Sequence, residues 1–506
     1  MTTCGEKICD LQTLANRCAE YRAGGKRIAH CHGAFDLLHP GHIQHLKAAR
    51  RLADVLVVTL TEDKYIRKGP GRPVYNERLR AETIASIACV DHVATSPWPT
   101  AVETLEMLQP DLYVKGQDYR NRQADVTGAI SREEETVIRL GGKLVFTDEV
   151  QFSSTKLLNR HFGVFNDRQR EYLADLRTRF TAGDVLSTFD SLKDLKVLVV
   201  GEAIIDEYHY CMPDAMSNKT PTISARFESA DVFAGGVEAV GNHLLGLAGS
   251  VDVIAGIGRD GYEVPRVLGV PRAGTQTIAR PDAPTVRKRR FVHRFSNQKL
   301  FELTFLDDHP IPVETEQELC RTLDALAPEA DVVIVTDFGH GFLTRPVIEK
   351  LREKSRFLAV NAQINSSNRG FNTIRKYARP DYISVDEHEI RLPFGDRYGS
   401  LEHLINRLSE ESGCSRINVT LGVGGTMYFD GNRFHTAPVF TDGIVDAIGA
   451  GDALLALTSL LVCRNAPSEL VPFAGNCMGG LMTQIVGHQR AVDAADLIKF
   501  IKTLLS

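Results

Sequence analysis

The sequence Gly33-Ala-Phe-Asp-Leu-Leu-His39-Pro-Gly-His42 lies between an apolar run, residues 27–32, and a helix-periodic segment, residues 42–53. This order predicts the end of a strand, a turn and the start of a helix. In open α/β sheets a ligand lies at the carboxyl ends of the strands, where the following helix offers free N–H groups. Two histidines separated by Pro-Gly can converge there on one phosphate, and Gly41 lets that phosphate approach the backbone. The stretch therefore predicts a phosphate site on a parallel α/β sheet.

The alternation of strands and helices continues outward from this stretch. From residue 26 to about 155, apolar runs alternate with helical patterns, which implies βαβ units and a parallel sheet. Residues 156–190 are charged and helix-periodic, and a second α/β series begins with LKVLVVGEAIID at residue 195. We expect two different α/β domains, residues 1–165 and residues 191–506, joined by a helical linker at residues 166–190.

The composition describes an ordinary globular protein. The 506 residues are 43% hydrophobic and 24% charged, with a net charge of -5, so nucleic acid is a poor candidate for the main partner. The 10 cysteines show no paired metal-site spacing and are expected to be reduced. The N-terminus carries no signal-peptide pattern, and the longest apolar run is too short to span a bilayer. We expect a cytoplasmic enzyme without a membrane partner.

His39 and His42 are the candidate catalytic residues of the first domain. In nucleotidyl transfer the α-phosphorus is attacked in line and charge builds on its oxygens, so imidazole donors placed there stabilise the transition state. The alternative is that both histidines are ordinary polar residues at a helix start. The whole string is more specific than either histidine alone.

The string resembles the signature of the cytidylyltransferase-like nucleotidylyltransferase family, and the resemblance covers residues 25–160. Arg72-Pro-Val, Lys115-Gly-Gln-Asp118-Tyr and Ser153-Ser-Thr155 are similar to further motifs of that family, in the same order. The resemblance implies nucleotide-binding roles for ten residues: Gly33, Phe35, Gly41, Lys68, Arg80, Lys115, Asp118, Ser153, Ser154 and Thr155.

A second candidate site is Asp446-Ala-Ile-Gly449-Ala450-Gly451-Asp452, which precedes an apolar helical stretch. Glycine-rich backbone at a helix N-terminus can bind the oxygens of the transferring phosphoryl group through its N–H groups. Asp452 is placed to take the proton of an attacking hydroxyl. In isolation such a string is often only a glycine-rich turn with a capping aspartate.

The wider sequence resembles the ribokinase-like (PfkB) sugar kinases over residues 193–506. The resemblance implies an α/β/α domain with a small β lid and an anion hole at Gly449, Ala450 and Gly451. It places ATP at Thr420, Gly422 and Gly425, and gives Glu389 a part in holding Mg²⁺ through water. Asp206, Gly235 and Gly236 would bind the sugar.

The basic run Lys288-Arg-Arg290-Phe-Val-His-Arg294 resembles the heptose-phosphate kinase branch. There Lys288, Arg290 and Arg294 would meet the phosphate already on the sugar; the alternative is a charged strand face. The pair of domains resembles the bifunctional heptose 7-phosphate kinase and heptose 1-phosphate adenylyltransferases of ADP-heptose synthesis, with the two halves in reversed order.

Several positions depart from the kinase pattern. Ala239 replaces an asparagine, Asn361-Ala-Gln363 replaces D-P-K, His340 replaces the lysine of D-Y-x-K-G, and Asp386 replaces the asparagine of N-x-x-E. These departures indicate a different sugar, a different phosphate position or a weakened kinase.

We expect a bifunctional transferase that makes a nucleotide-activated sugar, with Mg²⁺ as cofactor and a sugar phosphate and ATP or CTP as substrates. We also expect a homo-oligomer. One alternative is a single nucleotidylyltransferase with a degenerate kinase fold that binds a sugar phosphate or mediates oligomerisation. Another is a CTP-dependent enzyme acting on a polyol phosphate.

Overall fold

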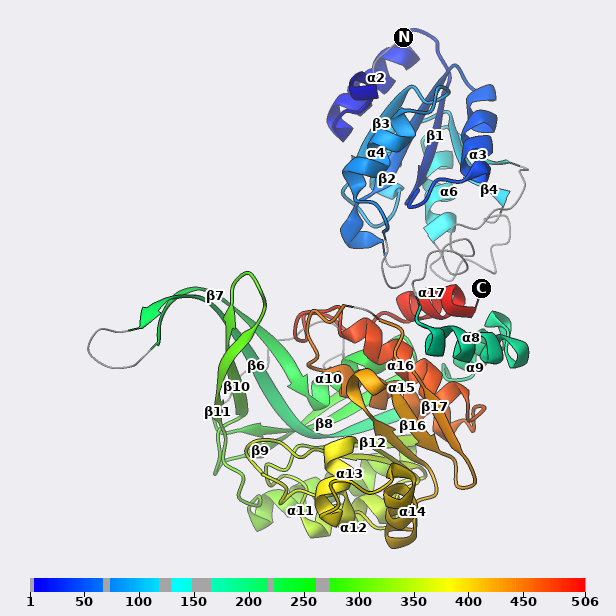
Figure 1. The fold of residues 1–506 in the computed structure, drawn as a ribbon. Coiled ribbons are helices and arrows are strands. Elements are labelled where there is room, and N and C mark those ends of the chain that lie inside the picture. The colour runs from blue at the N-terminus through cyan, green and yellow to red at the C-terminus, as the bar shows by residue number, and fades with distance from the viewer. Residues whose placement is uncertain are drawn as a thin grey trace. The chain divides into compact units, whose positions relative to one another are not determined.

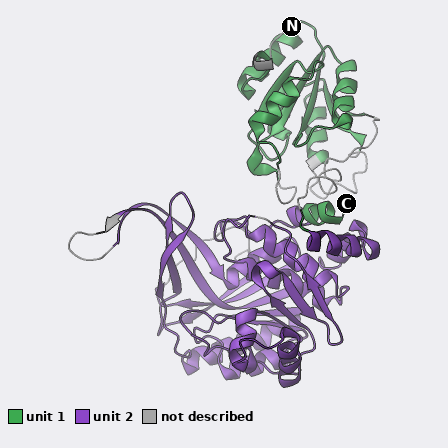
Figure 2. Ribbon diagram, viewed as in Figure 1, with its two compact units in different colours: residues 1–166, 498–506 green, residues 167–497 purple. Residues whose placement is uncertain are grey.

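A computed structural model describes residues 4–66, 73–117, 129–147, 165–216, 223–260, 274–441 and 443–505 (Figure 1). The chain divides into two compact units, and each is described by itself. Unit 1 comprises residues 1–166 and 498–506, and unit 2 comprises residues 167–497 (Figure 2). In the described part of the chain, the helices are too short or too polar to cross a membrane.

Unit 1 is built on one parallel sheet of five strands in the order β3-β2-β1-β4-β5. The strands are β1 (Ile28–Gly33), β2 (Val55–Thr61), β3 (His92–Ser96), β4 (Leu112–Gly116) and β5 (Lys143–Thr147). The helices are α1 (Cys4–Lys7), α2 (Leu11–Ala23), α3 (Pro40–Arg51), α4 (Glu77–Ala85), α5 (Val102–Leu108) and α6 (Ala129–Arg139). The predicted Rossmann-like parallel sheet is confirmed.

The strand order of unit 1 reverses between β1 and β4, and such a switch point is where open α/β sheets bind ligands. Leu56, Val58 and Leu60 on β2 are buried in one core with Ala29 and Cys31 on β1. Helices cover both faces of the sheet, which is why its central strands are almost continuously apolar. The carboxyl end of β1 therefore has a rigid base.

Unit 2 has a long strand, β6 (Lys196–Met216), that is shared by a central sheet and a β lid (Figure 1). The central strands run in the order β9-β8-β6-β12-β13-β14-β15-β16-β17, and the first seven are parallel. They are β8 (Ser250–Gly258), β9 (Thr275–Arg280), β12 (Val332–Asp337), β13 (Leu358–Ala362), β14 (Tyr382–Asp386), β15 (Ile417–Thr420), β16 (Thr426–Phe429) and β17 (Phe434–Ala437). In the lid, β7 (Ile223–Gly236) and β10 (Val286–His293) flank β6, and β11 (Lys299–Phe305) pairs with β10.

The central sheet of unit 2 lies between two helical layers. Figure 1 shows α11 (Val313–Leu326), α12 (Arg345–Lys354), α13 (Glu387–Phe394) and α14 (Leu401–Ser412) on one face. The other face carries α10 (Val237–Leu244), α15 (Ala450–Cys463) and α16 (Leu470–Met482). The last helix of the chain is α17 (Ala494–Leu505). The predicted α/β/α domain with a β lid is confirmed.

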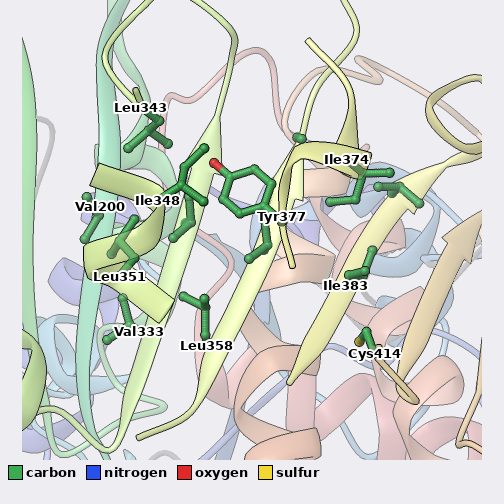
Figure 3. Close-up of a cluster of buried hydrophobic side chains, with 14 of the residues drawn as sticks. Val200, Val333, Leu343, Ile348, Leu351, Leu358, Ile374, Tyr377, Ile383 and Cys414 are labelled. Carbon is green, nitrogen blue, oxygen red and sulfur yellow. The ribbon is translucent and has the colours of Figure 1, made fainter. Parts of the chain in front are cut away.

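The main core of unit 2 fills the space between the sheet and the first of these helical layers. Val333 and Leu358 on the strands pack with Ile348 and Leu351 on α12, and Tyr377 closes the cluster (Figure 3). Helix α15, on the opposite face, is buried almost all round, as its uniformly apolar sequence requires. Asp452 is thus held at the start of a rigid helix.

The segment expected to link the domains forms two helices, α8 (Asp167–Arg179) and α9 (Ala182–Asp190), that pack within unit 2. Leu173 and Leu176 are buried, and the Tyr172 ring centroid lies 5.9 Å from that of Phe440. Gln169 Nε2 donates to the carbonyl oxygen of Val439 over 2.7 Å. These helices contribute to the packing of unit 2, and the predicted domain boundaries remain predictions.

Candidate active sites

His39 and His42 come together at the carboxyl end of β1. His39 is the N-cap residue of α3, and the two imidazole ring centroids lie 3.9 Å apart, with the planes 26° from parallel. The Phe35 ring centroid lies 5.5 Å from that of His42, and Phe35 has a φ of 43° in the loop after Gly33. Burial lowers the pKa of His39, which favours a neutral imidazole near pH 7. The structure therefore brings together Phe35 and the two predicted catalytic histidines, with Gly41 between them in the first turn of α3.

Lys115 lies at the carboxyl end of β4, beside β1. Its Nζ is 3.2 Å from Glu133 Oε2, and both side chains are buried. The same Nζ donates to the carbonyl oxygen of His32 over 3.5 Å. Its charge therefore sits at the sheet's switch point, where the predicted nucleotide site lies.

Arg80 forms hydrogen bonds with other groups of the protein, whereas the sequence predicts that it binds the nucleotide. Its guanidinium is fully buried and donates to the carbonyl oxygens of Ala34, Tyr75 and Thr61, and to Asp63 Oδ1 over 2.6 Å. These contacts hold the loop that contains Phe35 and connect it to the end of β2. A direct contact of Arg80 with a triphosphate remains a prediction. Five other predicted nucleotide-binding residues lie outside the described residues: Lys68, Asp118, Ser153, Ser154 and Thr155.

The sequence analysis did not predict a partly buried group of polar side chains that joins β1 to β2. His30 Nε2 and His32 Nδ1 lie 2.7 and 2.8 Å from Thr59 Oγ1, and His32 Nε2 lies 3.3 Å from Thr61 Oγ1. Burial, with the nearby charge of Lys115, lowers the pKa of His32 to about 3. Their spacing could have indicated this group, because His30 and His32 are two residues apart on one strand and so point to the same face of the sheet.

The turn Gly449-Ala450-Gly451-Asp452 forms the first turn of α15. Gly449 is its N-cap residue with a φ of 82°, and a Cβ there would lie 2.5 Å from His488 Cε1, so this position requires glycine. Asp452 is buried, and its Oδ1 accepts a hydrogen bond from Gln363 Nε2 over 3.3 Å. Burial raises the pKa of Asp452, and the charge of Asp206 adds to that rise.

Asp446 anchors the chain that leads into this turn. Its carboxylate accepts hydrogen bonds from Tyr208 Oη over 2.7 Å, Lys299 Nζ over 2.6 Å and the Gly487 N–H over 2.9 Å. Asp446, the first aspartate of the predicted motif, therefore stabilises the turn through hydrogen bonds, and Asp452, the last, is the candidate base.

Asp206, on β6, faces the glycine pair. A Cβ on Gly235 would lie 2.6 Å from Asp206 Oδ2, and Gly236 has a φ of 62°, so both positions need glycine for close approach. His488 Nε2 lies 3.6 Å from Asp206 Oδ2. Asp206, Gly235 and Gly236 are thus brought together as the sequence predicted, and their sugar-binding role remains a prediction.

Two of the three predicted phosphate-binding cations already have carboxylate partners. Arg290 donates to Asp206, and its Nε lies 2.9 Å from Glu302 Oε2. Arg294 lies 3.4 Å from Glu228 on a partly exposed surface. Lys288 Nζ lies 5.7 Å from the Phe338 ring centroid, and within the described ranges it has no carboxylate within ion-pair distance. Lys288 is the cation of this run that is available to a ligand.

Glu389 lies in a group of acidic side chains. It forms a capping box with Asp386, and its Oε1 accepts from the Ile364 N–H over 3.2 Å. Burial, with the charges of Asp386 and Asp452, raises the pKa of Glu389 to about 8. The other Glu389 oxygen, Oε2, accepts from the Asp386 N–H over 2.7 Å, so a role of Glu389 in holding Mg²⁺ through water remains a prediction.

The predicted ATP-binding turn follows β15. Thr420 ends that strand, and Gly422 and Gly425 have φ values of 55° and 97°. A Cβ on Gly425 would lie 2.1 Å from the carbonyl oxygen of Ala437, which excludes other residues there. The turn has the required shape, and contact with a nucleotide remains a prediction.

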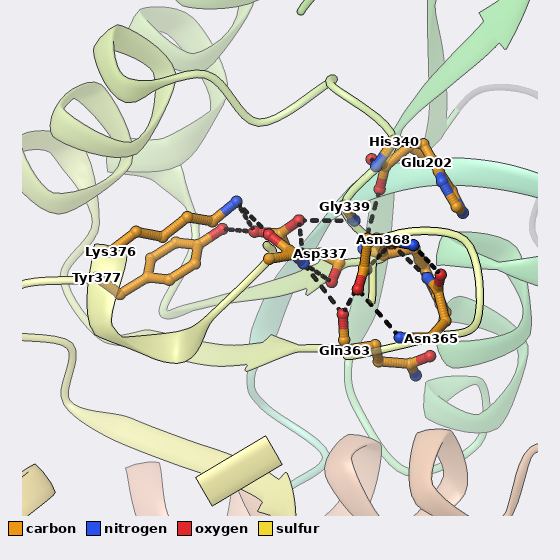
Figure 4. A network of polar contacts seen from close by, with 11 residues as sticks. Glu202, Asp337, Gly339, His340, Gln363, Asn365, Asn368, Lys376 and Tyr377 are labelled. Atoms are coloured by element: carbon orange, nitrogen blue, oxygen red, sulfur yellow. Dashed lines mark hydrogen bonds and ion pairs between the residues drawn. The ribbon is translucent and has the colours of Figure 1, made fainter. Parts of the chain in front are cut away.

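A polar network surrounds Asp337, at the carboxyl end of β12 (Figure 4). Tyr377 Oη donates to Asp337 Oδ2 over 2.6 Å, and Lys376 Nζ lies 2.5 Å from the same oxygen. Burial and the charge of Asp337 raise the pKa of Glu202 to about 7. Sequence reasoning did not predict this network, because its members come from distant segments.

His340 is fully buried beside the network, and both its ring nitrogens are without a hydrogen-bond partner in the described part of the protein. Burial, with the charges of Lys288 and Arg280, lowers the pKa of His340 to about 3. The residue that replaces the family lysine is therefore neutral.

Comparison with known proteins assigns the two units separately. Residues 30–160 match the cytidylyltransferase-like family, and residues 346–494 match the pfkB family of carbohydrate kinases. Residues 30–160 are thus similar to cytidylyltransferase-like proteins, and residues 346–494 are similar to pfkB carbohydrate kinases. The combination agrees with the fold of each unit.

Two curated relatives carry the name "Bifunctional protein HldE". The protein from Methylobacillus flagellatus is 38% identical over 157 residues, which are 31% of this chain and 31% of the relative. The protein from Bradyrhizobium sp. is 40% identical over 147 residues, 29% of each chain. The chain thus spans about a third of the length of these relatives.

Phosphofructokinase-2 from Escherichia coli, solved in complex with potassium, is similar in fold. It is 14% identical with a TM-score of 0.50, and the match covers 61% of this chain and 99% of that protein. This likeness supports the fold of unit 2 alone.

Proposed function

We propose that the chain is a bifunctional transferase that makes a nucleotide-activated sugar. The kinase half transfers a phosphate from ATP to C1 of a sugar phosphate, which gives a sugar bisphosphate. The nucleotidylyltransferase half joins a sugar 1-phosphate to a nucleotide with release of pyrophosphate. The observation that carries this proposal is that one chain holds both the stacked His39–His42 pair and the Gly449–Asp452 turn with its buried carboxylate. Both steps act at C1 of the sugar, and the relatives' name, with its word "bifunctional", agrees with two activities.

In the nucleotidylyltransferase half, His39 and His42 donate hydrogen bonds to the α-phosphate oxygens as negative charge builds on them. The sugar phosphate oxygen attacks the α-phosphorus in line, and pyrophosphate leaves. Burial keeps His39 neutral, so it acts as a hydrogen-bond donor. Lys115 adds positive charge at the switch point.

In the kinase half, the acceptor hydroxyl attacks the γ-phosphorus of ATP and Asp452 takes its proton. The bond from that phosphorus to ADP breaks, and ADP leaves with its electrons. The free N–H groups at the start of α15 hold the phosphoryl oxygens. Mg²⁺, held near Glu389 through water, would supply positive charge to the ATP phosphates.

We propose heptose 7-phosphate as the acceptor, phosphorylated at C1, and ATP or CTP as the nucleotide donor. The resemblance of both halves to the ADP-heptose enzymes supports this choice. Lys288 supports it too, because its charge acts on Asp452 and His340 and is available to a phosphate. The homo-oligomeric state and the cytoplasmic location are part of the same proposal.

Mass spectrometry of the products formed from ATP, Mg²⁺ and heptose 7-phosphate tests both steps together. A bisphosphorylated heptose alone would show the kinase without its second step. The chain is not proposed to remove the C7 phosphate, so a nucleotide-linked heptose without that phosphate requires a separate phosphatase. The nucleotidyl transfer step is therefore also tested by itself, with heptose 1-phosphate as the substrate. The proposal is contradicted if neither the bisphosphorylated heptose nor a nucleotide-linked heptose forms from either of the two sugar phosphates.

A second candidate is a nucleotidylyltransferase whose kinase fold has lost catalysis. The specific observation in its favour is the neutral, buried His340, where the resemblance leads one to expect a lysine. Measuring ADP release from wild type and Asp452→Asn on a panel of hexose and heptose phosphates separates the candidates. Equal rates on every sugar favour the second.

A further inference from the structure

Glu133 is a buried carboxylate on α6 for which the sequence predicts no role. Its Oε2 lies 3.2 Å from Lys115 Nζ and accepts a hydrogen bond from Tyr113 Oη over 2.9 Å. Its Oε1 accepts from the N–H of Ala101, the N-cap residue of α5, over 3.1 Å. A buried carboxylate is costly without such partners, so these contacts fix the Glu133 side chain against β4 and the start of α5.

Tyr113 and Lys115 are two residues apart on β4 and so point to the same face of the sheet. Helix α6 packs against this face, because Val137 on α6 and Tyr113 belong to one apolar cluster. The Lys115 Nζ lies 4.9 Å from the centroid of the Tyr113 ring, which is within the range of a cation–π contact. The ammonium group therefore has an aromatic ring and a carboxylate as neighbours, and packing fixes both of them.

Lys115 needs such neighbours for two reasons. A lysine side chain carries a compact charge on a flexible stem, which can adopt many conformations. Lys115 is also buried, and taking an ammonium group out of water is costly unless a carboxylate pairs with it. Glu133 meets both needs, because the ion pair restricts the side chain and compensates its charge. The same Nζ donates to the carbonyl oxygen of His32, near the end of β1 that leads to the histidine turn.

We propose that Glu133 is a positioning residue for Lys115: the ion pair holds the ammonium group at the carboxyl ends of β1 and β4, ready to bind the phosphates of the nucleotide. This inference rests on the proposed nucleotidyl transfer. Glu133 acts through Lys115 and takes part in no bond or proton transfer. A donor that is already in place costs no rearrangement when the nucleotide binds or reacts.

The test uses Glu133→Gln, which removes the negative charge at the same size. A misplaced ammonium group binds phosphate less well, so the KM for the nucleotide in pyrophosphate release should rise about tenfold. Lys115→Met, which removes the ammonium group itself, should raise it about a hundredfold. Glu135→Gln makes the same change at an exposed position on the same helix and should keep the wild-type KM. Circular dichroism and unchanged ADP formation by the kinase half check that each variant is folded.

A double-mutant cycle separates positioning from a purely structural role. If Glu133 acts through Lys115, adding Glu133→Gln to Lys115→Met should leave the KM within about a factor of two of that of Lys115→Met alone. A further rise of about tenfold in the double variant overturns the proposal, because a general disturbance of the domain adds to the loss of Lys115. A wild-type KM in Glu133→Gln or in Lys115→Met overturns it as well.

Tyr113→Phe keeps the inference testable if Glu133→Gln does not fold. This change removes the hydroxyl that donates to Glu133 and keeps the ring beside Lys115. Loss of one hydrogen bond should raise the KM for the nucleotide about threefold, and the rise should again be absent in the Lys115→Met background. A KM equal to that of wild type, or an equal rise in both backgrounds, overturns the proposal.

A second measurement separates the inference from the proposed reaction. Wild-type protein that releases no pyrophosphate from ATP or CTP with any sugar 1-phosphate overturns the nucleotidyl transfer. Hydrogen–deuterium exchange of residues 33–42 in the full-length protein then reports nucleotide binding in unit 1 alone. Glu133→Gln should need about tenfold more ATP or CTP than wild type for the same protection of this segment. Equal protection at equal concentration, or no protection in wild type, overturns the positioning role.

Discussion

The two candidate sites differ in how the chain assembles them. The histidine pair of unit 1 and Phe35 come from one short stretch, placed by a single strand-turn-helix unit, and Lys115 joins them from the neighbouring strand β4. The kinase site of unit 2 draws Asp206, Gln363, Glu389 and Asp452 from four elements that are far apart in the sequence. A local site tolerates change elsewhere in its domain, whereas a dispersed site depends on the packing of the whole domain.

The two candidate sites also differ in the charges of their side chains. In unit 1, burial lowers the pKa of His32 and His39, near the predicted phosphate site, and so favours their neutral forms. In unit 2, burial and the charge of Asp206 raise the pKa of Asp452, and the charge of Lys288 lowers it. We therefore expect single substitutions in unit 1 to remove one donor each, and those in unit 2 to disturb a balance of charges.

The largest expected effect is that of Asp452→Asn on the kinase. The amide keeps the size of the carboxylate and cannot accept the hydroxyl proton, so turnover should fall by about 10²–10⁴ with little change in ATP binding. ADP release with heptose 7-phosphate measures this. Asp308→Asn, an exposed change in the same unit, is the control, and an equal loss there would contradict a specific role for Asp452.

Next in size is the effect of His39→Ala or His42→Ala on pyrophosphate release. Loss of one preorganised donor to the developing charge should lower it by about 10²–10³, while ADP formation by the kinase stays intact. His45→Ala, one turn further along α3, removes a histidine bonded to Thr147 and serves as the control. Transferase activity within about a factor of two of wild type in both mutants would rule out the assignment.

The sequence allowed prediction of both folds and of the residues within local motifs. His39, His42 and the Gly449–Asp452 turn lie where their spacing predicts, because turn chemistry and helix starts are set by neighbours in the chain. Arg80 shows the limit of such reasoning. The sequence predicts a nucleotide-binding role for this residue, but it does not predict its hydrogen bonds to the carbonyl oxygens of Ala34, Tyr75 and Thr61.

The same limit applies to the kinase substitutions. Arg290 and Lys288 look equivalent in the sequence, and only the pairing of Arg290 with Asp206 and Glu302 distinguishes them. In the sequence, Gln363 is one of the departures from the kinase pattern, and its contact with Asp452 cannot be predicted from its neighbours in the chain. Contacts between distant segments depend on the packing of the sheet, and no local pattern encodes them.

A smaller effect, on stability, tests where unit 2 begins. Leu173 on α8 is buried, so Leu173→Ala should destabilise unit 2 by about 2–5 kcal/mol. Val313→Ala, whose side chain is exposed, is the control. A fragment of residues 191–506 should therefore unfold at lower urea concentration than a fragment of residues 167–506. Equal midpoints would show that α8 and α9 act only as a linker.

The smallest expected effect is a difference between the cations of the basic run, residues 288–294. It tests whether the candidate kinase site of unit 2 binds the phosphate that the sugar already carries. Lys288 is available to a ligand, whereas Arg290 and Arg294 are engaged with carboxylates. One charged contact to a phosphate corresponds to about a tenfold change in binding. Lys288→Met should therefore raise the KM for heptose 7-phosphate about tenfold, and Arg294→Met should leave it within about a factor of two.

The unphosphorylated heptose provides the internal control for this last comparison. If Lys288 meets the existing phosphate, its loss should leave the KM for free heptose unchanged, because that sugar has no charge to bind. An equal rise for both sugars would instead place Lys288 at the ATP phosphates or at Asp452, whose pKa it helps to lower. The pH profile separates these two, since loss of a cation beside Asp452 moves the acidic limb of kcat/KM to higher pH. A KM change confined to the phosphorylated sugar, with the acidic limb in place, supports Lys288 as the residue that reads the substrate's phosphate.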